Sequence, residues 1–147
     1  MALLISDVHI GFDRVTGTTP FSRERIRTSL LEGINHLLFV VNHAQKHLVI
    51  AGDLFDKFSV SNLDLWDAFQ PLHVWLSKSG HRLSLIAGNH DHSPRADAVS
   101  SFQLLARWLK AMHGDRVQVL GINEVASLDT GIAALAHCEN QTVFDQR

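Results

Sequence analysis

Three short apolar runs punctuate the chain, and polar residues follow each run at once. The runs occupy residues 2–6, 47–51 and 83–87. Their length and their lack of helical spacing are typical of strands buried on both faces of a parallel sheet. We therefore predict three parallel strands, with the polar residues placed at their carboxyl ends.

Between and after these runs, apolar residues recur at the spacing of an amphipathic helix. This periodicity predicts helices over residues 22–45, 61–76 and 98–113. Two further apolar segments, at residues 116–120 and 131–136, predict additional strands. Strands that alternate with helices long enough for crossover connections indicate the α/β class, with a largely parallel sheet and flanking helices.

Details of the predicted helices follow from individual residues. Ser22 and Ser61 are plausible N-caps of the first two helices. Pro71 inside the second helix predicts a kink or a break. We expect Trp66 and Trp75, on the same helix, to lie in the core.

Composition limits the classes of protein that the chain can represent. The 147 residues are 46% hydrophobic, which predicts one globular domain spanning residues 1–147. No apolar stretch approaches the ~20 residues that cross a bilayer, and no export signal is evident, so we expect a cytoplasmic protein without a membrane partner. The single cysteine, Cys138, excludes an internal disulfide and a cysteine-based zinc site. A net charge of −2 argues against a broadly basic face for nucleic acids, so contacts with phosphates must be local.

Residues able to bind metals follow the three predicted strands. Asp7 and His9 follow the first strand, Asp53 the second, and Asn89 the third. The carboxyl ends of parallel strands meet at one edge of a sheet, so we expect these four side chains to converge. In extended backbone Asp7 and His9 would point the same way and could grip one ion together.

The nature of these ligands indicates hydrolysis. Oxygen and nitrogen donors without sulfur favour Mn²⁺, Fe²⁺ or Zn²⁺, with Mg²⁺ also compatible. Two ions about 3.5–4 Å apart would supply a hydroxide near neutral pH and neutralise phosphate oxygens. His90 follows a ligand directly and is a candidate to protonate the leaving oxygen, with Asp91 orienting its imidazole ring.

Three short motifs together resemble the calcineurin-like metallophosphoesterases. They are Ser6-Asp7-Val8-His9, Gly52-Asp53-Leu54-Phe55-Asp56 and Gly88-Asn89-His90-Asp91. Within that superfamily they look most like the SbcD-type DNA repair nucleases, including those of large phages. The resemblance implies Mn²⁺-dependent phosphodiester hydrolysis on DNA with an SbcC-type ATPase partner. It also implies that Asp7, His9, Asp53 and Asn89 are metal ligands and that His90 is the catalytic histidine.

The chain departs from that family toward its end. The family completes its second metal site with later histidines, including a Gly-His-x-His signature that this sequence lacks. His137, at the end of a predicted strand, is the candidate for a late ligand. The chain thus resembles the front portion of a four-layer α/β sandwich, and an apolar face left open predicts a homodimer or a partner chain. Phosphate contacts are predicted from Arg14, Arg23 and Arg95.

Two other functions stay open at this point. A metallophosphoesterase for a small phosphomonoester or phosphodiester fits the mild acidity of the chain at least as well as a nuclease does. A non-catalytic fragment or binding subunit that keeps the front half of the site is the third possibility. Metal content and the choice of substrate separate the three.

Overall fold

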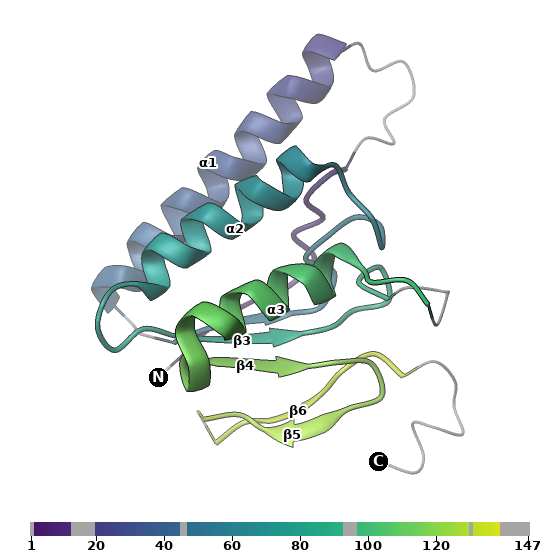
Figure 1. Cartoon of the computed structure of the whole chain (residues 1–147). Helices are drawn as coiled ribbons and strands as arrows, with labels where there is room; N and C mark the ends of the chain where they lie inside the picture. Colours follow the sequence, from purple (N-terminus) through teal and green to yellow (C-terminus); the bar gives the residue numbers. More distant parts are fainter. Residues whose placement is uncertain (1, 13–19, 45–46, 93–96, 130, 139–147) are drawn as a thin grey trace.

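The chain has an α/β fold in the computed structural model (Figure 1). The elements, in chain order, are β1 (Leu3–Ile5), α1 (Pro20–Ala44), β2 (His47–Ala51), α2 (Asn62–Leu76), β3 (Arg82–Ile86), α3 (Ser101–His113), η1 (Gly114–Arg116), β4 (Val117–Leu120), β5 (Val125–Ser127) and β6 (Ala133–Leu135). The structure describes all residues except 1, 13–19, 45–46, 93–96, 130 and 139–147.

The central sheet has the order β1-β2-β3-β4, and every neighbouring pair of strands is parallel. The register aligns Leu48 with Leu3 on one side and with Leu83 on the other. All four carboxyl ends therefore lie at the same edge of the sheet. The predicted class, a parallel α/β sheet with flanking helices, is confirmed.

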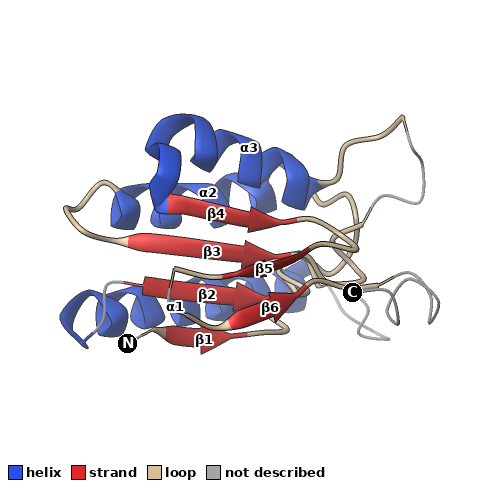
Figure 2. Ribbon diagram, turned by 90° about the horizontal axis from the view of Figure 1, so that it is seen from below, coloured by secondary structure: helices blue, strands red, loops and turns tan. Residues whose placement is uncertain are grey.

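The two faces of this sheet are covered differently (Figures 1 and 2). Helices α1, α2 and α3 pack on one face, where Leu48, Leu83, Leu85 and Val117 belong to the main core. The antiparallel β5-β6 hairpin lies against the other face and forms a smaller core with Val49 and other apolar residues. None of the described helices is long and apolar enough to cross a membrane.

Helix α1 begins two residues before the predicted start, at Pro20, so the prediction of Ser22 as its cap is wrong. Proline suits the first turn of a helix because its backbone nitrogen has no hydrogen to leave unpaired there. At the second helix, Ser61 is the N-cap, because its Oγ accepts a hydrogen bond from the amide of Asp64. Local capping chemistry was thus a reliable guide at one helix start and not at the other.

Helix α2 runs without a break through Pro71, so the prediction of a break is wrong and the prediction of a kink stays a prediction. The proline is buried together with Ala68 and Leu72, so core packing holds this turn in place despite the lost backbone hydrogen bond. Trp75 is 3% exposed, as expected, whereas Trp66 is 55% exposed, so its prediction as a core residue is wrong.

The last strands also differ from the prediction. The segment predicted at residues 131–136 is β6, which pairs with β5 and not with the parallel sheet. Strand β5 was missed because its sequence, Val125-Ala126-Ser127, holds one large apolar residue and forms no apolar run.

Candidate metal centre

Backbone hydrogen bonds join the loops that follow β1 and β2. The amide of His9 donates to the carbonyl of Asp53 at 3.0 Å, and the amide of Ile10 donates to the carbonyl of Leu54 at 2.9 Å. The amide of Asp56 returns a bond to the carbonyl of Ile10 at 3.0 Å. These bonds continue the pairing of the strands beyond the end of the sheet and fix the two loops against each other.

Three of the predicted ligands have left-handed backbone conformations. The φ angles are 54° at Asp7, 51° at His9 and 49° at Asp53. Non-glycine residues adopt such angles rarely, and such strain is concentrated at functional sites. The prediction that Asp7 and His9 share a direction through extended backbone is therefore corrected, because left-handed turns bring them together.

A first group of candidate ligands consists of Asp7, His9 and Asp53. One ligand atom from each lies within 4.8 Å of the other two. The Asp7 carboxylate is exposed, while His9 and Asp53 are partly buried. The convergence of these side chains at the sheet edge, predicted from the three apolar runs, is present in the structure.

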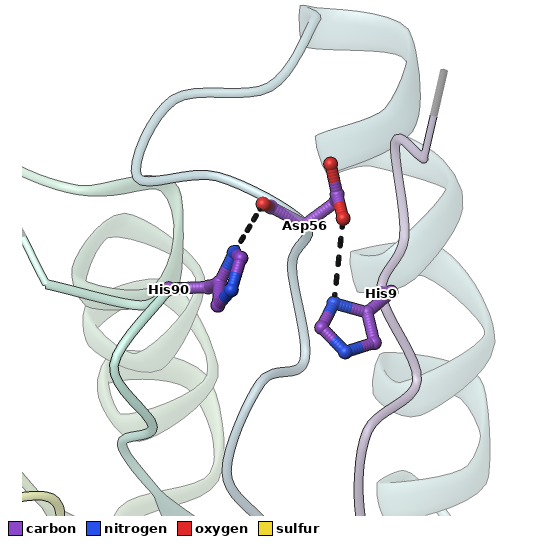
Figure 3. Close-up of side chains that lie close together, drawn as sticks. All are labelled: His9, Asp56 and His90. Carbon is purple, nitrogen blue, oxygen red and sulfur yellow. Dashed lines mark hydrogen bonds and ion pairs between the residues drawn. The ribbon is translucent and has the colours of Figure 1, made fainter. Parts of the chain in front are cut away.

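A second group shares His9 with the first and adds Asp56 and His90 (Figure 3). Oδ1 of Asp56 lies 3.4 Å from Nδ1 of His9, and the carbonyl oxygen of Asp56 accepts a hydrogen bond from Nδ1 of His90. The Asp56 side chain is 4% exposed. Asp56 was not among the predicted site residues, although its place three positions after Asp53 in an acidic motif was a usable signal.

Asn89 lies directly against Asp53. A terminal atom of its amide lies 3.2 Å from Oδ1 and 3.0 Å from Oδ2 of the Asp53 carboxylate. An amide nitrogen at this position donates to both oxygens, whereas an amide oxygen there completes a set of oxygens around a cation. The side-chain amide can therefore satisfy the carboxylate without a cation and coordinate one after it rotates.

Gly88 allows the loops after β2 and β3 to approach each other. A Cβ atom at this position would overlap Oδ1 and the backbone nitrogen of Asp53. The same Oδ1 accepts a hydrogen bond from the amide of His90 at 3.0 Å. The glycine of the Gly-Asn-His-Asp motif is thus required for close approach of the backbone.

Asp91 does not orient His90, which corrects the prediction. Its buried carboxylate accepts hydrogen bonds from three backbone amides, those of Leu54, Phe55 and Gly88, at 3.3, 3.2 and 3.0 Å. Burial raises the pKa of this carboxyl group, and the three amides oppose that rise. Asp91 therefore acts as a clamp between the two ligand-bearing loops.

The other predicted site residues lie farther from the two groups or outside the described residues. His137 lines the same groove as Asp7, Asp53 and Asn89, and its amide donates to the carbonyl of Ala87 at 3.0 Å. It belongs to neither group, so its role as a late ligand stays a prediction. Arg23 is exposed near the start of α1 and lines a different cleft. Arg14 and Arg95 lie outside the described residues.

The donor set fits a divalent metal. It contains carboxylate oxygens and imidazole nitrogens, which suit Mn²⁺, Fe²⁺ and Zn²⁺. Nδ1 of His9 is buried without a hydrogen bond, and its contact with Asp56 is longer than a good one. A cation bound beside Asp56 would satisfy this nitrogen, whereas a cation held with Asp7 would meet Nε2 of His9, which lies 3.9 Å from Oδ1 of Asp7. Either cation would neutralise the clustered carboxylates. Asp7, His9, Asp53 and Asn89 would hold one ion, and His9, Asp56 and His90 lie beside it.

Comparisons with known proteins bear on this site. A sequence model described as calcineurin-like phosphoesterase matches residues 2–142. Among solved structures, nuclease MPE from Pseudomonas putida is similar, with a TM-score of 0.38 and 23% identity over 85% of this chain. The match covers 50% of that nuclease, so the chain spans about half its length. No curated protein matched the chain significantly.

Proposed function

Because the chain belongs to the calcineurin-like phosphoesterase family, we propose that its metal centre hydrolyses phosphodiester bonds in DNA. The observation that carries the proposal is the meeting of Asp7, His9 and Asp53 within 4.8 Å at the carboxyl edge of a parallel sheet. Neutralisation of the phosphate charge favours hydrolysis of phosphate esters, and cations held by this cluster would supply it.

The metals, two in number and Mn²⁺ by preference, would supply charge neutralisation and a nucleophile at neutral pH. The protein contributes a positioned imidazole. Because the carbonyl oxygen of Asp56 only accepts, Nδ1 of His90 carries the hydrogen of their bond. Nε2 of His90 is then the atom that takes up or releases a proton, and it is our candidate for protonating the leaving oxygen.

The choice of DNA rests on the three motifs, which resemble those of SbcD-type nucleases. Gly52-Asp53-Leu54-Phe55-Asp56 and Gly88-Asn89-His90-Asp91 carry the resemblance, and the structure describes both segments without a gap. We extend the proposal to an SbcC-type ATPase as partner and to assembly as a homodimer.

A small phosphoester is the second candidate substrate. The net charge of −2 favours it, because DNA-binding faces are usually basic. A non-catalytic subunit that retains the metal centre is the third candidate, since among the described residues no side chain after His90 joins either ligand group.

The test compares substrates with the purified chain and Mn²⁺. We expect digestion of linear duplex or single-stranded DNA and slower turnover of bis(p-nitrophenyl) phosphate. Asp53→Asn removes charge from the metal cluster, and His90→Ala removes the proton donor while it leaves the cluster of Asp7, His9 and Asp53 intact. Both variants should lose at least about 10²-fold in activity, whereas Asp115→Asn, on the exposed η1 turn, should be unaffected.

Metal content separates the remaining alternatives. Two ions per chain with DNA digestion support the nuclease, and preferential turnover of the chromogenic ester supports the small substrate. One ion or none, with no hydrolysis of either substrate under any divalent metal, would reject catalysis by this chain and favour a binding subunit.

A further inference from the structure

A second cleft adjoins the metal centre on the side of helices α1 and α2. Its wall includes Ile10 and Phe12, which follow His9, and Lys57, which follows Asp56. The amide of Phe12 donates to the carbonyl of His9 at 3.1 Å. This turn places Phe12 directly after the loop that carries the candidate ligands. The cleft has a volume of about 340 Å³, which is within the range of small-molecule sites.

The lining of this cleft combines apolar side chains with charged ones, and its two acidic residues, Glu24 and Asp64, pair with Arg27. Ile10, Leu30 and Leu31 supply apolar surface, and the Phe12 side chain is 38% exposed. Arg23 and Lys57 add positive charge. This combination suits a flat, partly apolar ring attached to a phosphate.

The two arginines of the cleft differ in their availability. Arg27 contacts Glu24, Asp64 and Asp67, and these carboxylates neutralise it. Arg23 is exposed and makes no ion pair with any residue that the structure describes. Arg23 is therefore the cation that can receive an incoming phosphate.

We propose that this cleft binds one nucleotide of the DNA substrate, next to the phosphate held at the metal centre. The base lies against Phe12 and the leucines, and Arg23 contacts the phosphate on the far side of the sugar. The inference rests on the proposed function, because it places the substrate of that reaction. It makes Phe12 and Arg23 determinants of specificity for nucleotides over other phosphoesters.

The test measures binding separately from hydrolysis. Thymidine 5′-monophosphate is titrated into the chain in EDTA, with NMR chemical shifts as the readout. Arg23→Ala should weaken binding about tenfold, as expected for loss of one charge-assisted hydrogen bond. Arg25→Ala, also exposed on α1 but not in the cleft, is the matched control and should leave the affinity unchanged.

Two further comparisons make the result specific. With thymidine, which has no phosphate, Arg23→Ala should have no effect, while Phe12→Leu should weaken binding of both ligands about tenfold through loss of stacking. With Mn²⁺, Arg23→Ala should raise the KM for thymidine 3′-(p-nitrophenyl phosphate) 5′-phosphate, whose second phosphate can reach Arg23, and leave bis(p-nitrophenyl) phosphate unchanged.

The outcomes keep the two proposals apart. If nucleotide binding depends on Arg23 and Phe12 but nothing is hydrolysed, the proposed function fails and the cleft stands as a nucleotide site. The opposite result is digestion of DNA with no effect of the substitutions, so that Arg23→Ala, Phe12→Leu and Arg25→Ala bind the nucleotide equally well. That result, or DNA digestion by a chain that does not bind the nucleotide at all, would show that the cleft is not the nucleotide site.

Discussion

The backbone amide of His90 donates a hydrogen bond to Oδ1 of Asp53 at 3.0 Å. This bond ties a residue of the loop after β3 to a candidate ligand of the loop after β2. Because it fixes the carboxylate that lies between Asp7, His9 and Asn89, the geometry of the metal centre depends on how closely these two loops approach.

That approach can be tested at Gly88. In Gly88→Ala the added Cβ overlaps Asp53, so the loops must separate. We expect the free energy of unfolding to fall by about 1–3 kcal/mol and Mn²⁺ binding to weaken, as measured by urea unfolding and calorimetric titration.

Gly33→Ala is the matched control for this substitution. Gly33 lies inside α1, and a Cβ atom there meets nothing within 4 Å. Alanine should stabilise the helix by about 0.5–1 kcal/mol without a change in metal affinity. Equal effects of the two substitutions on metal binding would contradict the close approach that we describe.

The left-handed backbone at Asp7 makes a second prediction. A residue without a Cβ tolerates a φ of 54° best, so Asp7→Gly should be more stable than Asp7→Ala by about 1 kcal/mol. Both variants should lose Mn²⁺ affinity, since both lack the carboxylate. Thermal unfolding without metal measures the first effect and calorimetric titration the second.

The same pair of substitutions at Glu32 provides the control. Glu32 is exposed on helix α1, where alanine should be more stable than glycine by about 1 kcal/mol. If glycine is the more stable variant at position 7 and alanine at position 32, the backbone at Asp7 is strained. The same order at both sites would show that the left-handed conformation of Asp7 costs nothing.

The sequence predicted the parallel sheet and the meeting of Asp7, His9 and Asp53, because short apolar runs fix both the strands and the edge where their ends lie. It did not reveal Asp56, whose position depends on the left-handed turn at Asp53. It also misassigned Asp91. Whether a carboxylate faces an imidazole or three backbone amides is decided by how two loops pack, and sequence spacing carries little information about that.

The clamp formed by Asp91 gives the third prediction. Both oxygens of its carboxylate accept hydrogen bonds from backbone amides. In Asp91→Asn an NH₂ group replaces one of these oxygens and faces a backbone N–H, so that at least one hydrogen bond is lost. The free energy of unfolding should fall by about 1–3 kcal/mol, and Mn²⁺ affinity should fall with it. Asp115→Asn, at an exposed position, should change stability by less than about 0.5 kcal/mol. Lost activity with unchanged stability and metal affinity would instead assign Asp91 a direct catalytic role.

The contacts of His113 make stability depend on pH. Arg116 donates to its Nδ1 at 3.1 Å, so Nδ1 is unprotonated and Nε2 donates to Nδ1 of His73 at 3.0 Å. A second proton on His113 would be carried by Nδ1, and its N–H would then face the N–H of Arg116. Burial, with Arg116 and His73 nearby, lowers the pKa of His113 from 6.5.

A lowered pKa means that the folded state binds fewer protons than the unfolded state between the two values. The stabilisation is therefore complete above pH 6.5 and is lost as the pH falls toward the lower, folded-state pKa. Urea unfolding from about pH 8 to about pH 5 should show this loss, and His113→Gln should reduce it. His47, whose pKa burial also lowers, should keep part of the dependence in that variant. The exposed His36→Gln should match the unsubstituted chain, and identical pH profiles for all three proteins would refute the tautomer assignment at His113.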